Sequence, residues 1–190
     1  MTATADAPHV GLVVEGRGDQ FAVPAMLRKY LTERGEYRDI LGKPVPCHGR
    51  DKAVAPGGIE GYVATAATRP GCRGVLAILD GEGDGVCELG PLLRERAQTT
   101  TGKPVFVCLA EPKFEAWLVA SAESMELEGL TYAPDRDSIA LIKGAMNVKY
   151  AKPTWQPRLA SRLDFAVARP RSRSLDRLLS KLDDLAAALA

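Results

Sequence analysis

Three uninterrupted apolar runs constrain the fold of this chain more than any other feature of its sequence. They lie in VGLVVEG at 10–16, GVLAILD at 74–80 and KPVFVCLA at 103–110. A strand with one face in water alternates apolar and polar residues, whereas a strand covered by helices on both faces is apolar throughout. The three runs therefore predict central strands of a mostly parallel sheet.

The segments between these runs have helical patterns. Apolar residues from Phe21 to Leu31 recur with a period near 3.6, and Asp19 is placed to cap that helix. Further helices are predicted at 59–69, 87–98 and 114–125, and a short strand or irregular segment at 43–52. Strands that alternate with helices predict an α/β protein, a Rossmann-like three-layer sandwich with helices on both faces of the sheet.

The chain divides into three parts of unequal character. Residues 1–9 are small and polar and are expected to form a flexible tail, 10–125 form the α/β core, and 126–190 form a helical and irregular extension packed on it, within a single domain. Inside the extension a helix is predicted around 137–147. A final helix follows, with Ser174 as its N-cap and leucines at 175, 178, 179, 182 and 185.

Composition excludes several classes of protein. No apolar run approaches the roughly 18 residues of a membrane span, and the N-terminus lacks the pattern of a secretion signal. Four cysteines at 47, 72, 87 and 108 form no CxxC pair, which argues against a disulfide framework or a zinc site. We therefore expect a cytoplasmic protein with reduced cysteines and no membrane partner.

Acidic residues follow two of the predicted strands. Glu15 ends the first, Asp80 ends the second, and Glu82 and Asp84 follow on the glycine-rich turn GEGDG. The carboxyl ends of parallel strands meet at one edge of the sheet, where ligands bind in such folds. Carboxylates held together repel one another unless a hard cation lies between them, and oxygen ligands favour Mg²⁺ or Mn²⁺ over zinc.

The same residues allow other interpretations. An isolated glutamate after a strand is usually a turn residue, and an acidic loop commonly has no further role. The first turn offers Gly16 and Gly18, but Phe21 replaces the third glycine of a dinucleotide-binding fingerprint, and no GxxxxGK[ST] loop exists.

The combination of motifs resembles a known superfamily. A strand followed by Glu-Gly, then a strand followed by Asp-x-acid-x-acid, resembles the Toprim domain of topoisomerases, primases and overcoming-lysogenization-defect nucleases. More narrowly, VEGRGD, LDGEGDGVCELGPLLRERA, EPKFEAWLVASAES, IKGAM, PTWQ and RSRSL resemble the bacterial family called domain of unknown function 4276, from about Val10 to Leu185. The chain departs from that family's usual pattern at Asp19, Glu82 and Leu175.

The resemblance implies a Toprim-like fold and a metal-dependent nuclease of bacterial defence or DNA processing. It implies Glu15 and Asp80 as catalytic residues and Mg²⁺, or Mn²⁺, as the cofactor. Glu15, Asp80, Glu82 and Asp84 would be its ligands, and Glu115 in KFEAWLVA would be an additional acid of the site. It also implies an ATPase partner, since related Toprim nucleases often act beside one.

The distribution of charge suggests an anionic partner. Residues 1–142 hold 15 basic and 20 acidic side chains, whereas residues 143–190 hold 10 basic and 4 acidic ones. The residues expected to contact a nucleic acid backbone, DNA rather than RNA, are Arg50, Lys52, Lys143, Arg171 and Arg173. Two alternatives remain open at this point: a Toprim-fold subunit that binds nucleic acid or acts as an effector without catalysis, and a receiver-like domain phosphorylated on Asp80.

Overall fold

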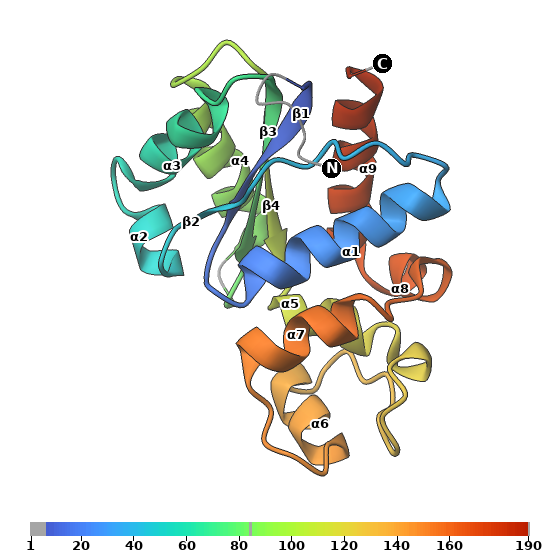
Figure 1. The fold of residues 1–190 in the computed structure, drawn as a ribbon. Coiled ribbons are helices and arrows are strands. Elements are labelled where there is room, and N and C mark those ends of the chain that lie inside the picture. Colours follow the sequence, from blue (N-terminus) through green and yellow to red (C-terminus); the bar gives the residue numbers. More distant parts are fainter. Residues whose placement is uncertain (1–6, 84, 190) are drawn as a thin grey trace.

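The computed structural model describes residues 7–83 and 85–189 and has an α/β architecture (Figure 1). Its strands are β1 (His9–Val14), β2 (Val45–Pro46), β3 (Cys72–Asp80) and β4 (Val105–Ala110). The helices of the first two thirds are α1 (Asp19–Glu33), α2 (Arg50–Val54), α3 (Gly58–Ala67), α4 (Val86–Gln98), α5 (Phe114–Val119) and the 3₁₀ turn η1 (Ala122–Ser124). The remaining helices are α6 (Ser138–Ala145), α7 (Lys152–Ala160), α8 (Phe165–Arg171) and α9 (Arg173–Ala187).

The four strands form one sheet, and every pairing in it is parallel. Their spatial order is β2-β1-β3-β4, with Val14 opposite Ile78 and Asp80 opposite Ala110. Because all strands point the same way, their carboxyl ends lie along one edge. The prediction of an α/β fold around a parallel sheet is therefore confirmed.

Helices cover both faces of the sheet, which explains why the strands are apolar throughout. Leu12, Leu76 and Cys108 belong to a core shared with α1, α5 and α9, and Val13 and Val75 belong to a second core shared with α3 and α4. Figure 1 shows α3 and α4 on one side of the sheet and α1 and α9 on the other. Successive residues of a strand point to opposite faces, so a strand with both faces buried has no polar alternation.

Several predicted boundaries are wrong. The strand expected from residue 10 begins at His9, and the helix expected at 114–125 ends at Val119, followed by the turn η1. At this break Ser121 accepts a hydrogen bond from the Asp164 backbone N–H and contacts the Ser124 hydroxyl, so its side chain is used in local and tertiary contacts.

The N-cap predicted for the last helix is also wrong. Ser172, not Ser174, caps α9 by accepting the Leu175 N–H. The hydroxyl of Ser174 instead accepts the indole N–H of Trp117 and the backbone N–H of Glu111. Two serines in RSRS are equally good caps by residue type, and the buried tryptophan decides between them.

Residues 126–190 contribute directly to the layer beside the sheet. Leucines of α9 pack in the same core as α1 and the central strands, and α7 lies along α1. Among the described residues, no helix has both the length and the apolar character needed to cross a membrane.

Candidate functional site

The site lies where the strand order reverses. The chain leaves β1 for β2 on one side and later returns to β3 on the other, so β1 and β3 flank a switch point. In open α/β sheets ligands bind at the carboxyl ends of the strands beside such a point. Glu15 directly follows β1 and Asp80 is the last residue of β3, so both acids stand at this position.

The structure brings three of the predicted acids together. Glu15 Oε2 accepts a hydrogen bond of 2.9 Å from the Asp80 backbone N–H, which ties the ends of the two strands. One carboxylate oxygen from each of Glu15, Asp80 and Glu82 lies within 4.8 Å of the other two. Asp80 is 9% exposed, whereas Glu82 is open to solvent.

The glycine-rich turn after β3 is folded back on the end of β4. Gly81 and Glu82 donate their backbone N–H groups to the carbonyls of Ala110 and Pro112, each at 2.8 Å. A side chain at Gly81 would put its Cβ 2.9 Å from the Ala110 oxygen, so glycine is required there. Glu82 has a φ of 50°, a left-handed conformation that costs free energy in a residue other than glycine and is typical of functional turns. Asp84, the other acid predicted in this turn, lies outside the described residues.

Burial disfavours the ionised form of the carboxyl groups in this site. Desolvation, reinforced by the neighbouring Glu15, raises the pKa of Asp80 to about 7, although the Phe114 N–H bonded to its Oδ1 at 2.8 Å opposes the shift. Desolvation likewise raises the pKa of Glu15, and Asp19 and Glu82 add to that shift. Several carboxyls are thus held together in a place that disfavours their charge.

Lys152 supplies positive charge to this cluster. Its Nζ lies 3.3 Å from Glu115 Oε1 and 3.9 Å from Asp80 Oδ2. Burial of Lys152 opposes its protonation, but Glu115 and Asp80 outweigh that effect and raise the lysine pKa above its ordinary value. The ammonium group therefore stays charged and joins the two carboxylates.

Glu115, the additional acid predicted from the sequence, is completely buried behind Lys152. Its Oε1 accepts a hydrogen bond of 3.0 Å from the hydroxyl of Tyr150. Its Oε2 has no hydrogen-bond partner among residues 7–83 and 85–189. A buried carboxylate is costly without partners, so Glu115 depends on Tyr150 and Lys152 to stay in place.

Asp19 does not cap α1, contrary to the sequence-based expectation. Gly18 occupies the N-cap position, and the Asp19 carboxylate accepts the Gly16 N–H at 2.9 Å and the Gln156 side-chain amide at 3.2 Å. Burial is the main cause of the raised pKa of Asp19. The residue connects the turn after β1 to α7 and adds negative charge beside Glu15.

The roles of Lys152 and Gln156 were not predicted. A sequence feature nonetheless points to the position of Lys152, because the proline at 153 is typical of the first turn of a helix. A positive charge there opposes the helix dipole, so its presence indicates nearby negative charge. Gln156 belongs to the PTWQ motif of the family resemblance, but a single glutamine does not by itself predict which residue it contacts.

The predicted nucleic-acid-binding cations are distributed over four helices, α2, α6, α8 and α9. Arg50 donates from Nε to the Asp80 carbonyl at 3.0 Å, so it braces the acidic turn, and Lys52 is exposed on the same short helix α2. Lys143 is exposed in the last turn of α6. Arg171 pairs with Glu123 at 2.8 Å, and Arg173 lines a groove beside β4.

The acid cluster could hold a metal ion. Two oxygens that ligate one Mg²⁺ at about 2.1 Å are at most about 4.2 Å apart, so the observed limit of 4.8 Å requires only a small closing movement. Glu82 can supply this movement because it is exposed on a turn. The donors are all oxygens, which suits a hard cation.

The fold and the site together define an α/β protein with a parallel sheet and a cluster of acids at its switch point. No family model, no curated protein and no solved structure matches the chain.

Proposed function

We propose that this protein is a Mg²⁺-dependent nuclease of the Toprim type that cleaves phosphodiester bonds. The observation that carries the proposal is the convergence of Glu15, Asp80 and Glu82 within 4.8 Å at the carboxyl ends of β1 and β3. The sequence resemblance assigns the same residues to metal binding and proton transfer. A cluster of acids held together against burial and mutual repulsion is expected where a cation binds.

The cation in this proposal is Mg²⁺, with Mn²⁺ as a substitute, held by Asp80, Glu82 and Glu15. Bound there, the ion would offset the negative charge that builds on a phosphate during cleavage. Asp80 suits the role of central ligand because the Phe114 N–H holds its Oδ1 at 2.8 Å while its other oxygen lies on the side of Lys152.

Glu15 would transfer a proton to or from the reacting oxygen. The Asp80 N–H orients it through Oε2, and in the metal-free site burial raises its pKa above the ordinary value. Lys152 would stabilise charge on the phosphate, and Glu115 with Tyr150 would position that lysine.

The substrate class follows from the same chemistry. Nucleic acid has the phosphodiester bonds that such a site attacks, and Arg50 and Lys52 on α2 are candidates to contact its backbone beside the acidic turn. DNA rather than RNA, an ATPase partner and a role in bacterial defence are proposed on the sequence resemblance alone.

Cleavage of plasmid DNA, single-stranded DNA and RNA in Mg²⁺ or Mn²⁺ tests the proposal. The variants are Glu15→Gln and Asp80→Asn, which keep an oxygen to accept the N–H groups of Asp80 and Phe114. We expect metal-dependent cleavage by the unmodified protein and a loss of about 10²-fold or more in either variant. Glu95→Gln, at an exposed acid of α4, is the matched control and should cut normally.

Each other outcome has a distinct meaning. Equal cleavage by all the proteins would assign the activity to a contaminant and contradict the proposal. Absence of cleavage, with Mg²⁺ binding that Asp80→Asn abolishes, would support the alternative of a non-catalytic subunit.

A further inference from the structure

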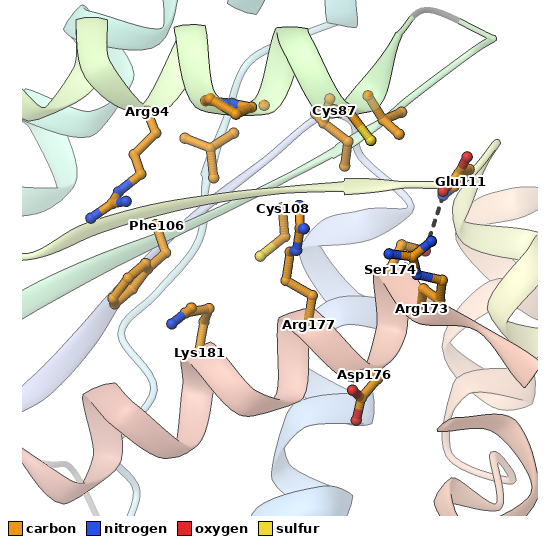
Figure 2. Close-up of a pocket in the computed structure, with 15 residues that line it drawn as sticks. Cys87, Arg94, Phe106, Cys108, Glu111, Arg173, Ser174, Asp176, Arg177 and Lys181 are labelled. Atoms are coloured by element: carbon orange, nitrogen blue, oxygen red, sulfur yellow. Dashed lines mark hydrogen bonds between the residues drawn. The ribbon is translucent and has the colours of Figure 1, made fainter. Parts of the chain in front are cut away.

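A groove between α4 and α9 lies along the outer edge of β4, and nothing in the proposed reaction uses it. Figure 2 shows α4 on one side, α9 on the other and β4 between them. The groove has a volume of about 590 Å³ and is lined by residues of all three elements, including Arg94, Phe106 and Arg177. Because β4 is the last strand in the order β2-β1-β3-β4, no strand of the described residues pairs with its outer edge.

Two residues of β4 present unpaired backbone groups to this groove. Pro104 and Ala110 point their carbonyls inward, toward the N–H groups of Val75 and Gly81, so the odd-numbered residues between them point outward. The outward groups of Val105 are already satisfied within the chain: Gln98 Oε1 accepts its N–H and Arg94 Nε donates to its carbonyl, both at 3.1 Å. Those of Val107 and Leu109 have no hydrogen-bond partner in the described part of the chain.

The wall formed by α9 has a row of positive charges. Arg173, Arg177 and Lys181 are spaced by four residues, and α9 runs antiparallel to β4, with Lys181 near Phe106 and Ser174 near Glu111 (Figure 2). Four residues of helix rise by about 6 Å, and side chains on one face of a strand repeat every 6.6 to 6.8 Å or so. A strand laid against β4 would therefore place every second side chain opposite one of these cations.

The two arginines of this row are available for a partner. Arg173 and Arg177 have no acidic partner among residues 7–83 and 85–189, whereas Lys181 pairs with Asp184 at 2.9 Å. Opposite them on α4, the guanidinium of Arg94 also reaches into the groove. The row of cations on α9 and the unpaired edge of β4 together suit an extended polypeptide with acidic residues at alternate positions.

We propose that an acidic, extended segment of a partner protein binds in this groove and adds to β4 as a further strand. Backbone pairing with Val107 and Leu109 supplies the affinity, and carboxylates opposite Arg173, Arg177 and Lys181 supply the specificity. The groove favours a polypeptide over a nucleic acid strand for two reasons. Its floor is a row of peptide donors and acceptors, and Phe106, the aromatic residue among the described residues that line it, is already contacted by Arg94 and Lys181 at 5.3 and 4.9 Å.

The experiment measures binding of a fluorescein-labelled peptide, Glu-Val-Glu-Val-Glu, by fluorescence anisotropy. The same peptide N-methylated at all five residues keeps all side-chain charges but has no backbone N–H on either edge with which to pair as a strand. A decamer of thymidylate is the nucleic acid probe. We expect the unmodified peptide to bind and N-methylation to weaken binding roughly tenfold or more, because two or more hydrogen bonds are lost.

Variants of the protein separate charge from strand pairing. Arg177→Ala should weaken peptide binding roughly threefold, as expected for one exposed ion pair, and Arg136→Ala, at an exposed arginine outside the groove, should have no effect. Val107→Pro removes one outward N–H but no bond to β3, and should weaken binding without moving any cation. Circular dichroism checks that this variant is folded. The N-methylated peptide tests strand pairing independently, because it is measured on the unmodified protein.

Three results would overturn the proposal. Equal binding of the N-methylated peptide would show attraction by charge alone. Displacement of the peptide by the thymidylate decamer, with Val107→Pro binding both normally, would assign the groove to nucleic acid. No peptide binding at all would mean that the cations only protect the edge of the sheet from pairing.

Discussion

Asp80 combines a nearly buried position with two negative neighbours and one positive neighbour. Glu15 is bonded to its backbone, Glu82 follows it on the turn, and Lys152 lies 3.9 Å from its carboxylate. Its raised pKa means that the folded protein binds a proton at this residue more tightly than the unfolded chain does. Without a metal ion, ionised Asp80 therefore lowers the stability of the fold.

The sign of this effect gives a pH-dependent prediction. An Asp carboxyl with the ordinary pKa of 3.8 titrates at about 7 in the folded protein, so between those values the folded state retains a proton that the unfolded state loses. The contribution of Asp80 to the free energy of unfolding is fully present below pH 4 and is lost as pH rises toward 7, by about 4 kcal/mol. Asp80→Asn keeps the acceptor for Phe114 and has no carboxyl proton to lose as the pH rises.

In EDTA at pH 8 we therefore expect Asp80→Asn to unfold at higher urea concentration than the unmodified protein, and at pH 4 the two should converge. Glu95→Gln is again the control, since that residue is exposed on α4. Two results would contradict the view that ionised Asp80 destabilises the fold. One is an Asp80→Asn variant less stable than the unmodified protein at pH 8, and the other is a variant stabilised by the same amount at both pH values.

Single residues of the site were predictable to different degrees. Glu15 and Asp80 follow apolar strands directly, so the sheet topology alone places them at one edge. Lys152 and Tyr150 are joined to Glu115 by tertiary packing of α7 and its preceding loop, and no local pattern encodes which acid they meet. The hydroxyl of Ser174 shows the same limit, because its bond to Trp117 connects α9 with α5.

At the scale of elements, the packing of α7 against α1 depends on one close contact, at Gly18. A Cβ at Gly18 would lie 2.4 Å from the Gln156 Oε1 and 3.3 Å from the Lys152 Cβ. The glycine thus allows α7 to bring its glutamine to Asp19 and its lysine to the acid cluster. A shift of α7 would move both side chains together.

Gly18→Ala should therefore destabilise the protein by about 1–3 kcal/mol, the usual effect of overpacking, and weaken Mg²⁺ binding at the same time. Urea unfolding and isothermal titration with Mg²⁺ measure the two effects. Gly16→Ala is the matched control, because its added Cβ meets only Asp19 Oδ2, at 3.4 Å. If both substitutions behaved alike, the close approach of α7 would not be the cause.

The elements themselves were predictable where their apolar pattern was long. The strands β1, β3 and β4 and the helices α1, α3, α4 and α9 have such patterns, and the final helix has leucines at helical spacing. The short helices α2, α7 and α8 were not predicted. Prolines at 157 and 170 lie inside the last two, and the stability of these helices comes from packing rather than from their own sequences.

At the scale of the whole molecule, part of the uneven charge distribution is used in ion pairs between the basic C-terminal segment and acids earlier in the chain. The basic last quarter of the chain supplies Lys152 to the acids of the core, and Arg171 to Glu123. Arg169, in contrast, pairs with Asp176 of its own segment. The charge asymmetry of the sequence is therefore in part a requirement of folding, and only the remaining cations, such as Arg173 and Arg177, are left for partners.

Metal binding should be visible as stability of the whole chain. A ligand at 100 times its dissociation constant stabilises the folded state by about 2.7 kcal/mol, which raises Tm by roughly 5–11 °C for a chain of this size. We expect such a rise with Mg²⁺ for the unmodified protein and for Glu95→Gln, measured by differential scanning calorimetry against EDTA. Glu82→Gln should lose most of it, because Glu82 is one of the three converging acids. An unchanged rise in Glu82→Gln would remove that residue from the metal site.

The position of Lys152 in the chain also has a consequence for biosynthesis. The acids Glu15, Asp80 and Glu115 all precede it, and a protein is synthesised from its N-terminus. A nascent chain therefore carries the strands and their carboxylates before the ammonium group that joins Glu115 to Asp80 has been added. The site acquires its final electrostatic balance only after α7 has emerged from the ribosome, so the growing polypeptide has its acids long before it has a complete site.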